Sequence, residues 1–287
     1  MKDLSEQDLA RNIPLAAAAF AGEKRVVRVG TATIGGEPLV VMAGPCAVED
    51  EAMTVEIARA VKAAGATMLR GGAFKPLTFP YRNSHTFELG EVGLRFLRQA
   101  GDEAGLPVVT ECTDVRQLDL VARYADMIQI GARNAQNFPL LTEAGRLRKP
   151  VLLKRGFGMS LRDWLGAAEY VLVEGNPNVV LGERGIVAPH THHPQSRFIV
   201  DLQVVPAVRE YSHLPIIVDP SHSTFRRAYV APVARAAVAI GADGIIVDVH
   251  PRPEEAAVDP LQALDYDAFG ALMRDLRGIA AVVGRTL

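Results

Sequence analysis

Short runs of apolar, often β-branched residues recur along the chain from residue 39 onward, separated by segments with a longer repeat. Each run is short enough for a strand and is bounded by glycine, proline or polar residues. The runs begin about 29 residues apart on average, close to the roughly 31 expected when about 250 residues form eight strand–helix units. We therefore predict eight strands: Leu39–Gly44, Thr67–Gly71, Pro107–Glu111, Met127–Gly131, Val151–Arg155, Val179–Glu183, Pro215–Asp219 and Gly244–Val249.

The segments between these runs show the period of a helix. One predicted helix face collects apolar residues at i, i+3, i+4, i+7 and i+11, namely Leu161, Trp164, Leu165, Ala168 and Leu172. A second helix is predicted by similar spacing in Val115, Leu118, Ala122 and Ala125. Gly65 and Gly241 follow helical runs, where a C-terminal cap favours a residue with a left-handed backbone.

Regular alternation of strands and helices predicts parallel strands covered by helices, either as a closed barrel or as an open doubly wound sheet. Eight units favour a single (β/α)8 TIM barrel. Val26–Val29 and Thr31–Ile34 alternate around glycines and predict an N-terminal β-hairpin within residues 24–41 that plugs the barrel floor. We expect residues 1–23 to form an N-terminal arm and residues 24–287 the barrel catalytic domain.

The composition of the chain argues against several classes of protein, among them nucleic-acid-binding and membrane proteins. The 31 Lys and Arg residues against 33 Asp and Glu give a net charge of −2, which disfavours nucleic acid as a partner. Apolar runs such as residues 14–22 are far below the roughly 18 residues of a membrane span, and acidic residues precede this one, unlike in a signal peptide. We therefore expect a cytoplasmic protein with no membrane partner. Cys46 and Cys112, 66 positions apart, form no CxxC pair, which argues against a disulfide framework or a structural zinc site.

Cations gather at the carboxyl ends of the predicted strands, where barrel enzymes place their reactive groups. Arg70 and Lys154 directly follow apolar triplets, so their charges would be buried and would need an anionic partner. We expect a bound phosphate and carboxylate to supply it. The cations at this mouth are Arg70, Lys75, Arg133, Lys154 and Arg184, although most Arg and Lys residues of any sequence are merely solvated.

A second set of strand-end residues has the chemistry of metal ligands. Cys46, His222, Asp248 and Asp259 follow the first, seventh and eighth predicted strands, which are neighbours in a closed barrel. One thiol, one imidazole and two carboxylates suit one divalent ion such as Mn, Fe, Co or Zn. Separately, Cys46 could be a small core residue, His222 a core histidine and Asp259 a helix cap. His190, His192 and His193 offer another cluster, for which a solvated loop is the favoured interpretation.

Seven strings of residues, in order between about residues 26 and 280, resemble a known family. They are residues 43–46 (AGPC), 69–76 (LRGGAFKP), 130–134 (IGARN), 153–156 (LKRG), 182–185 (GERG), 219–223 (DPSHS) and 247–251 (VDVHP). Together they are similar to type I 3-deoxy-D-arabino-heptulosonate 7-phosphate (DAHP) synthase, in the subgroup close to 3-deoxy-D-manno-octulosonate 8-phosphate synthase. The resemblance implies a metal-dependent barrel, present as a homo-oligomer, that joins phosphoenolpyruvate to a small aldose phosphate. That aldose is erythrose 4-phosphate in the first step of the shikimate pathway.

The resemblance also implies roles for residues. It assigns substrate binding to Arg70, Lys75, Pro76, Thr78, Arg133, Lys154 and Arg184, and metal binding to Cys46, His222, Asp248 and Asp259. Together with the chemistry of the side chains, it makes Lys154, His222 and Cys46 the catalytic candidates, with proton transfer by Lys154 or by a metal-held water near His222.

Three positions depart from the family pattern. Leu77 stands where an arginine helps to bind the acceptor phosphate, Asp248 stands where glutamate is usual, and residues 187–200 are rewritten. Arg82, or Arg226 and Arg227, are possible replacements for the missing guanidinium. The alternatives are therefore a related synthase with a different aldehyde acceptor in specialised metabolism, or a catalytically silent barrel that acts as a binding partner.

Overall fold

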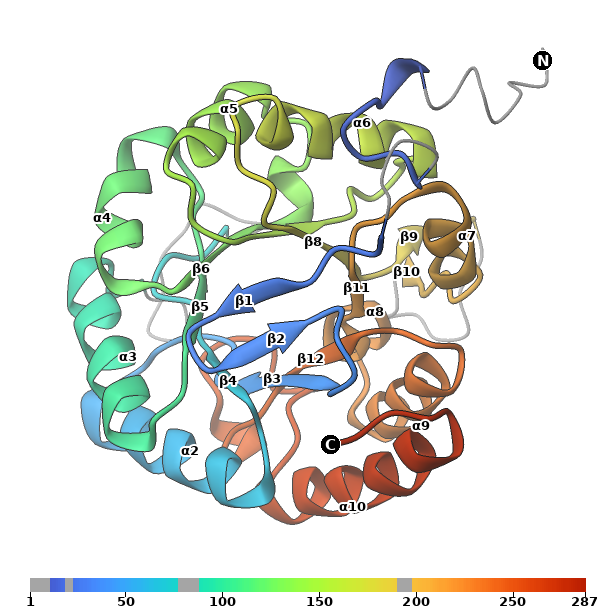
Figure 1. Cartoon of the computed structure of the whole chain (residues 1–287). Coiled ribbons are helices and arrows are strands. Elements are labelled where there is room, and N and C mark those ends of the chain that lie inside the picture. Colours follow the sequence, from blue (N-terminus) through green and yellow to red (C-terminus); the bar gives the residue numbers. More distant parts are fainter. Residues whose placement is uncertain (1–10, 19–22, 77–87, 190–197) are drawn as a thin grey trace.

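Eight parallel strands close into a barrel in the computed structural model, which describes residues 11–18, 23–76, 88–189 and 198–287 (Figure 1). Around the barrel the strands follow the order β11-β12-β3-β4-β5-β6-β7-β8. Their bounds are β3 Val40–Gly44, β4 Met68–Arg70, β5 Val108–Glu111, β6 Met127–Ile130, β7 Val151–Lys154, β8 Val179–Glu183, β11 Ile216–Val218 and β12 Gly244–Asp248. The eight predicted strands and the (β/α)8 class are confirmed.

The helices form a ring outside the barrel (Figure 1). They are α2 Glu51–Ala64, α3 Glu91–Ala104, α4 Leu118–Tyr124, α5 Phe138–Arg146, α6 Leu161–Leu172, α7 Val204–Tyr211, α9 Arg227–Ala239 and α10 Tyr266–Val282. The short helix α8 Pro220–Thr224 lies inside this ring, directly after β11, and carries His222 to the mouth of the barrel. The predicted face of α6 is buried except for its first residue, Leu161. At the end of α2, Gly65 has φ +106° and donates its N–H to the carbonyl of Lys62, so the predicted left-handed cap is confirmed.

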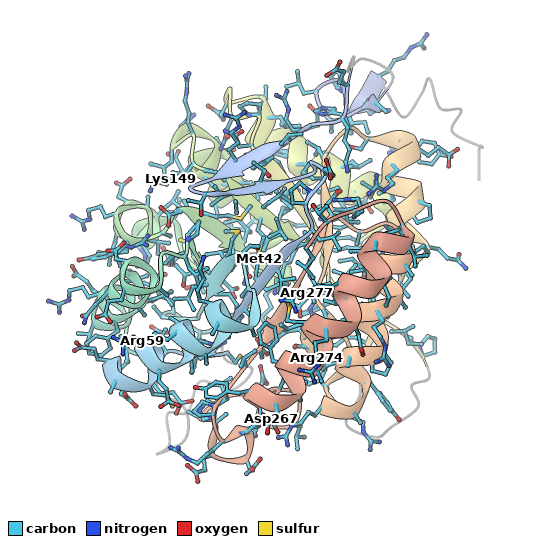
Figure 2. All side chains as sticks on the ribbon, turned by 60° about the horizontal axis from the view of Figure 1, so that its bottom comes forward. Met42, Arg59, Lys149, Asp267, Arg274 and Arg277 are labelled. Carbon is cyan, nitrogen blue, oxygen red and sulfur yellow. The ribbon has the colours of Figure 1, made fainter. Side chains whose placement is uncertain are left out.

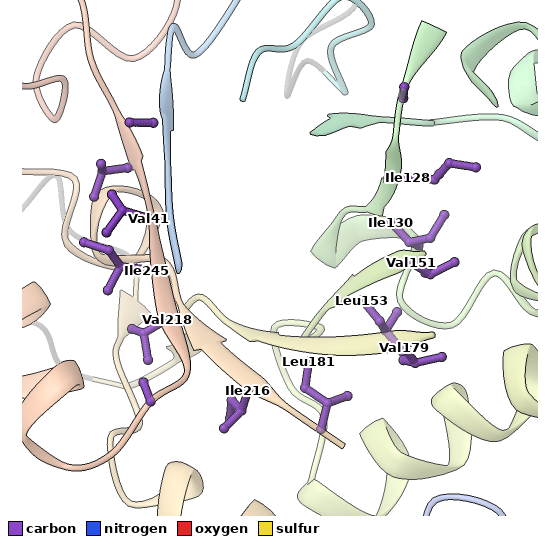
Figure 3. Packing of buried hydrophobic residues seen from close by; sticks show 14 of the residues in the cluster. Val41, Ile128, Ile130, Val151, Leu153, Val179, Leu181, Ile216, Val218 and Ile245 are labelled. Atoms are coloured by element: carbon purple, nitrogen blue, oxygen red, sulfur yellow. The ribbon is translucent and has the colours of Figure 1, made fainter. Parts of the chain in front are cut away.

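Alternate residues of each strand divide the apolar core into two parts. Val41, Leu153 and Val218 point outward from their strands and pack under the helices (Figure 3). Their neighbours Met42, Leu152 and Ile217 belong to a separate cluster inside the barrel. Figure 2 labels Met42 in this interior and several charged side chains on the surrounding helices. Strands buried on both faces explain why the sequence shows continuous apolar runs.

An antiparallel hairpin crosses the floor of the barrel (Figure 1). Its strands are β1 Val27–Val29 and β2 Ala32–Ile34. Their inward side chains, Val27, Val29, Ala32 and Ile34, join the cluster inside the barrel. The predicted plug is thus confirmed, although residues from Val40 onward belong to the barrel itself. The division into an arm and a catalytic domain stays a prediction.

One buried carboxylate fastens distant parts of the floor. Asp243, just before β12, is fully buried and forms ion pairs with Lys24, Arg209 and Arg285. The nearest distances are 3.3 Å for Arg209 and 3.4 Å for Arg285. Its second oxygen accepts the N–H of Ile216 at the start of β11. This group, called the Asp243 clasp below, joins the hairpin, α7, the last residues of the chain and the two strands that end the barrel sequence.

A short second pair of strands, β9 Ile186–Val187 and β10 Phe198–Ile199, follows β8 near the mouth of the barrel. The sequence patterns do not predict it, because two residues on each side are too few to show an alternation. Every helix in the described ranges is too short or too polar to cross a lipid bilayer.

Candidate active site

A cavity opens at the carboxyl ends of the barrel strands. All five predicted cations line it, together with residues that the sequence analysis did not select. The lining residues are Arg70, Lys75, Pro76, Glu111, Gln129, Gly131, Ala132, Arg133, Lys154, Phe157, Arg184, Phe198, His222, Phe225, Val258 and Asp259. Thr78 and Leu77, for which the sequence predicts acceptor contacts or their loss, lie outside the described residues, as do Arg82 and the three histidines of the 190–193 loop.

Two of the buried cations already have carboxylate partners within the protein. Arg70 Nη1 lies 2.6 Å from Asp248 Oδ1 and also donates to the carbonyl of Pro45 at 2.8 Å. Lys154 Nζ donates to Asp219 Oδ2. The expectation that a bound anion is needed to pair these charges is therefore wrong. Asp219 and Asp248 follow or end neighbouring strands, and the barrel brings them to the cations across the mouth.

The other cations are placed differently. Lys75 Nζ donates to the carbonyl of Cys46 and lies 3.1 Å from its Sγ. Burial disfavours the charged ammonium, but Cys46, Asp259 and Glu111 together outweigh burial and raise the pKa of Lys75. Arg133 is exposed, on the short turn after β6, and Arg184 is buried directly after β8. The cavity thus keeps a strongly cationic wall.

Cys46, His222, Asp248 and Asp259 meet at one side of the cavity. One ligand atom from each residue lies within 4.8 Å of the other three. Asp259 Oδ2 is 3.2 Å from Cys46 Sγ and 3.7 Å from His222 Nε2, and His222 Nε2 is 3.7 Å from Asp248 Oδ2. The sequence prediction that these four residues come together is supported by the geometry. If Cys46 and His222 were only core residues and Asp259 only a helix cap, nothing would explain why their donor atoms converge with that of Asp248.

Asp219 supports this group from behind, a role that the sequence analysis missed. Its carboxylate accepts the backbone N–H of His222 and lies 3.0 Å from His222 Nδ1. Burial disfavours a charged imidazole, but Asp219 and Asp248 outweigh burial and raise the pKa of His222 to about 10. An aspartate at the end of the strand before a ligand histidine was the available signal.

The donor set fits a divalent transition metal. Thiolate, imidazole and carboxylate ligands suit Mn, Fe, Co or Zn, and the carboxylates of Asp248 and Asp259 beside His222 favour a bound cation. The hydrogen bond that Asp219 accepts from Nδ1 leaves Nε2 facing the other three ligand atoms, the arrangement that orients metal-bound histidines.

Three phenylalanines line the cavity beside Arg184, and none was selected from the sequence. The ring of Phe157 stacks on Phe198 with centroids 4.9 Å apart, and Phe198 stacks on Phe225 at 5.7 Å. The guanidinium of Arg184 lies 4.1 Å from the Phe198 centroid and 5.1 Å from that of Phe157. These contacts hold the guanidinium plane by cation–π attraction.

Arg226 and Arg227 do not line the cavity, so the prediction that they replace the missing acceptor guanidinium is not supported by their positions. Arg226 lies over the ring of Tyr229. Arg227 donates to the carbonyls of Ala263 and Pro260.

Comparisons with known proteins agree with this site. A model of the DAHP synthetase I family matches residues 19–280. A phospho-2-dehydro-3-deoxyheptonate aldolase from Thermotoga maritima is 48% identical over 266 residues, covering 92% of this chain and 77% of the relative. A 2-dehydro-3-deoxyphosphooctonate aldolase from Syntrophotalea carbinolica is 32% identical over 273 residues, covering 90% of this chain and 96% of the relative.

Solved structures give the same relationship. The crystal structure of DAHP synthase from Thermotoga maritima matches with a TM-score of 0.89 and 46% identity, over 95% of this chain and 78% of that one. A truncated form of the Thermotoga enzyme matches with a TM-score of 0.88 and 45% identity, over 96% of this chain and 99% of that one. The resemblance seen in the seven sequence strings is therefore confirmed, and the chain belongs to the DAHP synthetase I family.

Proposed function

We propose that the protein is a transferase that condenses phosphoenolpyruvate with erythrose 4-phosphate to give 3-deoxy-D-arabino-heptulosonate 7-phosphate and phosphate, the first step of the shikimate pathway. Family membership and the Thermotoga relative support this reaction. The observation that carries the proposal is a single cavity in which five cations border the Cys46, His222, Asp248 and Asp259 group. A silent barrel acting only as a binding partner would not need both features together.

The cationic wall would hold the donor. Arg133, Lys154 and Arg184 would bind the phosphate and carboxylate of phosphoenolpyruvate. Arg70 and Lys75 line the same cavity and contact the metal-ligand candidates Asp248 and Cys46. Fixing both anionic groups orients C3 of the enol toward an aldehyde and exposes C2 to water. C3 would bond to the aldehyde carbon while water adds to C2, and the aldehyde oxygen would take up one proton of that water. The bond between C2 and the bridging oxygen then breaks, phosphate leaves with the second proton, and C2 becomes a ketone.

Cys46, His222, Asp248 and Asp259 would hold one divalent ion, of Mn, Fe, Co or Zn. A bound ion would polarise the aldehyde oxygen or lower the pKa of water. Lys154 is a side chain placed to move a proton, because its ammonium pairs with the buried carboxylate of Asp219, which stabilises the protonated form. A water molecule near His222 is the other candidate, since both ring nitrogens of His222 are used, Nδ1 by Asp219 and Nε2 by the metal position.

Phosphoenolpyruvate should bind more weakly when a positively charged side chain of the cavity is removed. We expect Arg133→Ala and Lys154→Ala each to raise the Kd for phosphoenolpyruvate about 10- to 100-fold, since a charge-assisted hydrogen bond contributes roughly 1.5–3 kcal/mol. Titration calorimetry measures this directly. Arg59→Ala is the matched control, because Arg59 pairs with Glu103 on the outer helices. Unchanged affinity in both cavity variants would refute the donor assignment.

For the acceptor substrate, the structure offers a specific alternative to erythrose 4-phosphate. Leu77 stands where the family pattern has a phosphate-binding arginine, and neither Arg226 nor Arg227 lines the cavity in its place. Three phenylalanines line the cavity instead. These observations favour a related synthase with another aldehyde acceptor as the second candidate function.

A panel assay of phosphate release from phosphoenolpyruvate separates the two. We expect turnover with erythrose 4-phosphate, and we expect Leu77→Arg to lower the KM of that acceptor by about one to two orders of magnitude through a restored guanidinium contact. Arabinose 5-phosphate and unphosphorylated aldehydes complete the panel, and the Kd for phosphoenolpyruvate is the control. A wild-type protein active only with another aldehyde would assign the rival function.

We also infer that the enzyme acts in the cytoplasm and assembles as a homo-oligomer. Membership of the DAHP synthetase I family supports both inferences.

A further inference from the structure

Asp248 is held through both of its carboxylate oxygens. Arg70 Nη1 lies 2.6 Å from Oδ1, and the side-chain amide of Gln262 donates to Oδ2 at 2.6 Å. Oδ2 is also the oxygen that lies 3.7 Å from His222 Nε2, in the group of four ligand atoms. The amide of Gln262 therefore fixes the orientation of the oxygen that faces the metal position.

Gln262 lies on the same turn as another ligand candidate. Its backbone N–H donates to the carbonyl of Asp259 at 3.3 Å. Asp259 itself has φ +56°, a left-handed conformation that is uncommon for a residue other than glycine. One tight turn therefore delivers the carboxylate of Asp259 and the amide of Gln262 to the same side of the cavity.

The burial of Gln262 is not explained by packing. Its side chain is 1% exposed, and its Oε1 has no hydrogen-bond partner among the described residues. Leaving a buried amide oxygen unsatisfied costs free energy, which an apolar side chain of similar size would avoid. What the amide provides in return is its hydrogen bond to Asp248.

Arg227 fixes the turn on both sides of Gln262. Its Nε donates to the carbonyl of Ala263 at 2.7 Å, and its Nη2 donates to that of Pro260 at 3.1 Å. The backbone N–H of Arg227 also donates to the carbonyl of Leu261. Three bonds from one residue at the start of α9 thus brace the segment that carries Asp259 and Gln262.

We propose that Gln262 is a positioning residue for the metal site: its amide aims Oδ2 of Asp248, a ligand one methylene shorter than glutamate, at the ion, and Arg227 holds the turn that places it. This inference rests on the metal-binding role proposed above. Partners that orient metal ligands in this way typically change metal affinity about 10- to 100-fold when they are removed.

Cobalt binding tests the proposal without relying on turnover. Metal-depleted wild type and Gln262→Leu are titrated with Co²⁺, and the Kd and the d–d absorption bands are recorded. We expect the Kd to rise about 10- to 100-fold in the variant and its d–d bands to change, because the carboxylate ligand is no longer oriented. Gln129→Leu is the matched control: Gln129 also donates an amide to a carboxylate in the cavity, that of Glu111, and should leave the Kd unchanged.

Two further variants complete the test. Gln262→Asn keeps a polar side chain but withdraws the amide, so it should weaken Co²⁺ binding as leucine does. Arg227→Met should weaken Co²⁺ binding while the Kd for phosphoenolpyruvate stays at the wild-type value. A wild-type Co²⁺ affinity and spectrum in both folded Gln262 variants would overturn the positioning role alone. A wild-type protein that binds no Co²⁺ would overturn the metal role and this inference with it.

Discussion

Replacing Cys46 with serine is expected to remove the metal and to lower kcat/KM by about three orders of magnitude or more. The hydroxyl keeps the size of the thiol but is not a soft anionic ligand near neutral pH. Losing an ion that supplies several kcal/mol of transition-state stabilisation corresponds to a rate effect of this size. Metal analysis of the purified protein, together with phosphate release from phosphoenolpyruvate, measures both effects. Chelator treatment of the wild type should likewise abolish turnover.

Cys112→Ser is the matched control for this experiment. Cys112 is fully buried, its thiol donates to the carbonyl of Asp114, and burial raises its pKa to about 11. It does not belong to the group of four ligand candidates that contains Cys46, so both the metal content and the turnover should be retained. Equal losses in the two cysteine variants would point to general destabilisation. A wild-type protein that retains no metal and releases no phosphate would favour the silent barrel.

The second large effect is expected from Asp219→Asn, as a loss of stability. Asp219 is fully buried and pairs with Lys154 and His222, and the charges of these partners hold its pKa well below its usual value despite its burial. Removing its charge leaves the buried ammonium of Lys154 without a carboxylate. We expect the free energy of unfolding to fall by about 3–5 kcal/mol, measured by denaturant titration.

Asp201→Asn serves as the control for Asp219. Asp201 also pairs with a buried cation, Arg155, but its side chain is 28% exposed and Arg155 keeps a second carboxylate partner in Glu183. Asp201→Asn should therefore lower the free energy of unfolding much less than Asp219→Asn. If both variants unfolded at the same denaturant concentration, the Lys154–Asp219 pair would not have the stabilising role assigned to it.

The barrel was predictable because its signal repeats. Each of eight units buries its strand on both faces, so each strand shows as an apolar run that ends at a polar residue. The same property made the metal group predictable. Cys46, His222 and Asp248 end or follow strands that close against one another, and their side-chain types are those of metal ligands.

The partners of these residues were not predictable, because they depend on which strand ends face each other across the mouth. From its own strand, Lys154 is predicted to be an unpaired charge, but its partner Asp219 lies 65 residues later in the sequence. The stack of Phe157, Phe198 and Phe225 is built from three separate segments, namely the loop after β7, the start of β10 and the end of α8, so no single stretch of sequence predicts it. Arg227 has the charge expected of a residue that binds an anion, yet its guanidinium donates to backbone carbonyls.

The Asp243 clasp affects the kinetics of folding and unfolding of the barrel. Its Lys24 pair joins residues 219 positions apart, and its Arg285 pair adds the last residues of the chain. Contacts between such distant segments form only after most of the chain is ordered, since loop closure must come first. The clasp therefore contributes to the barrier against opening more than to the speed of folding, so it acts as a kinetic lock on the completed barrel.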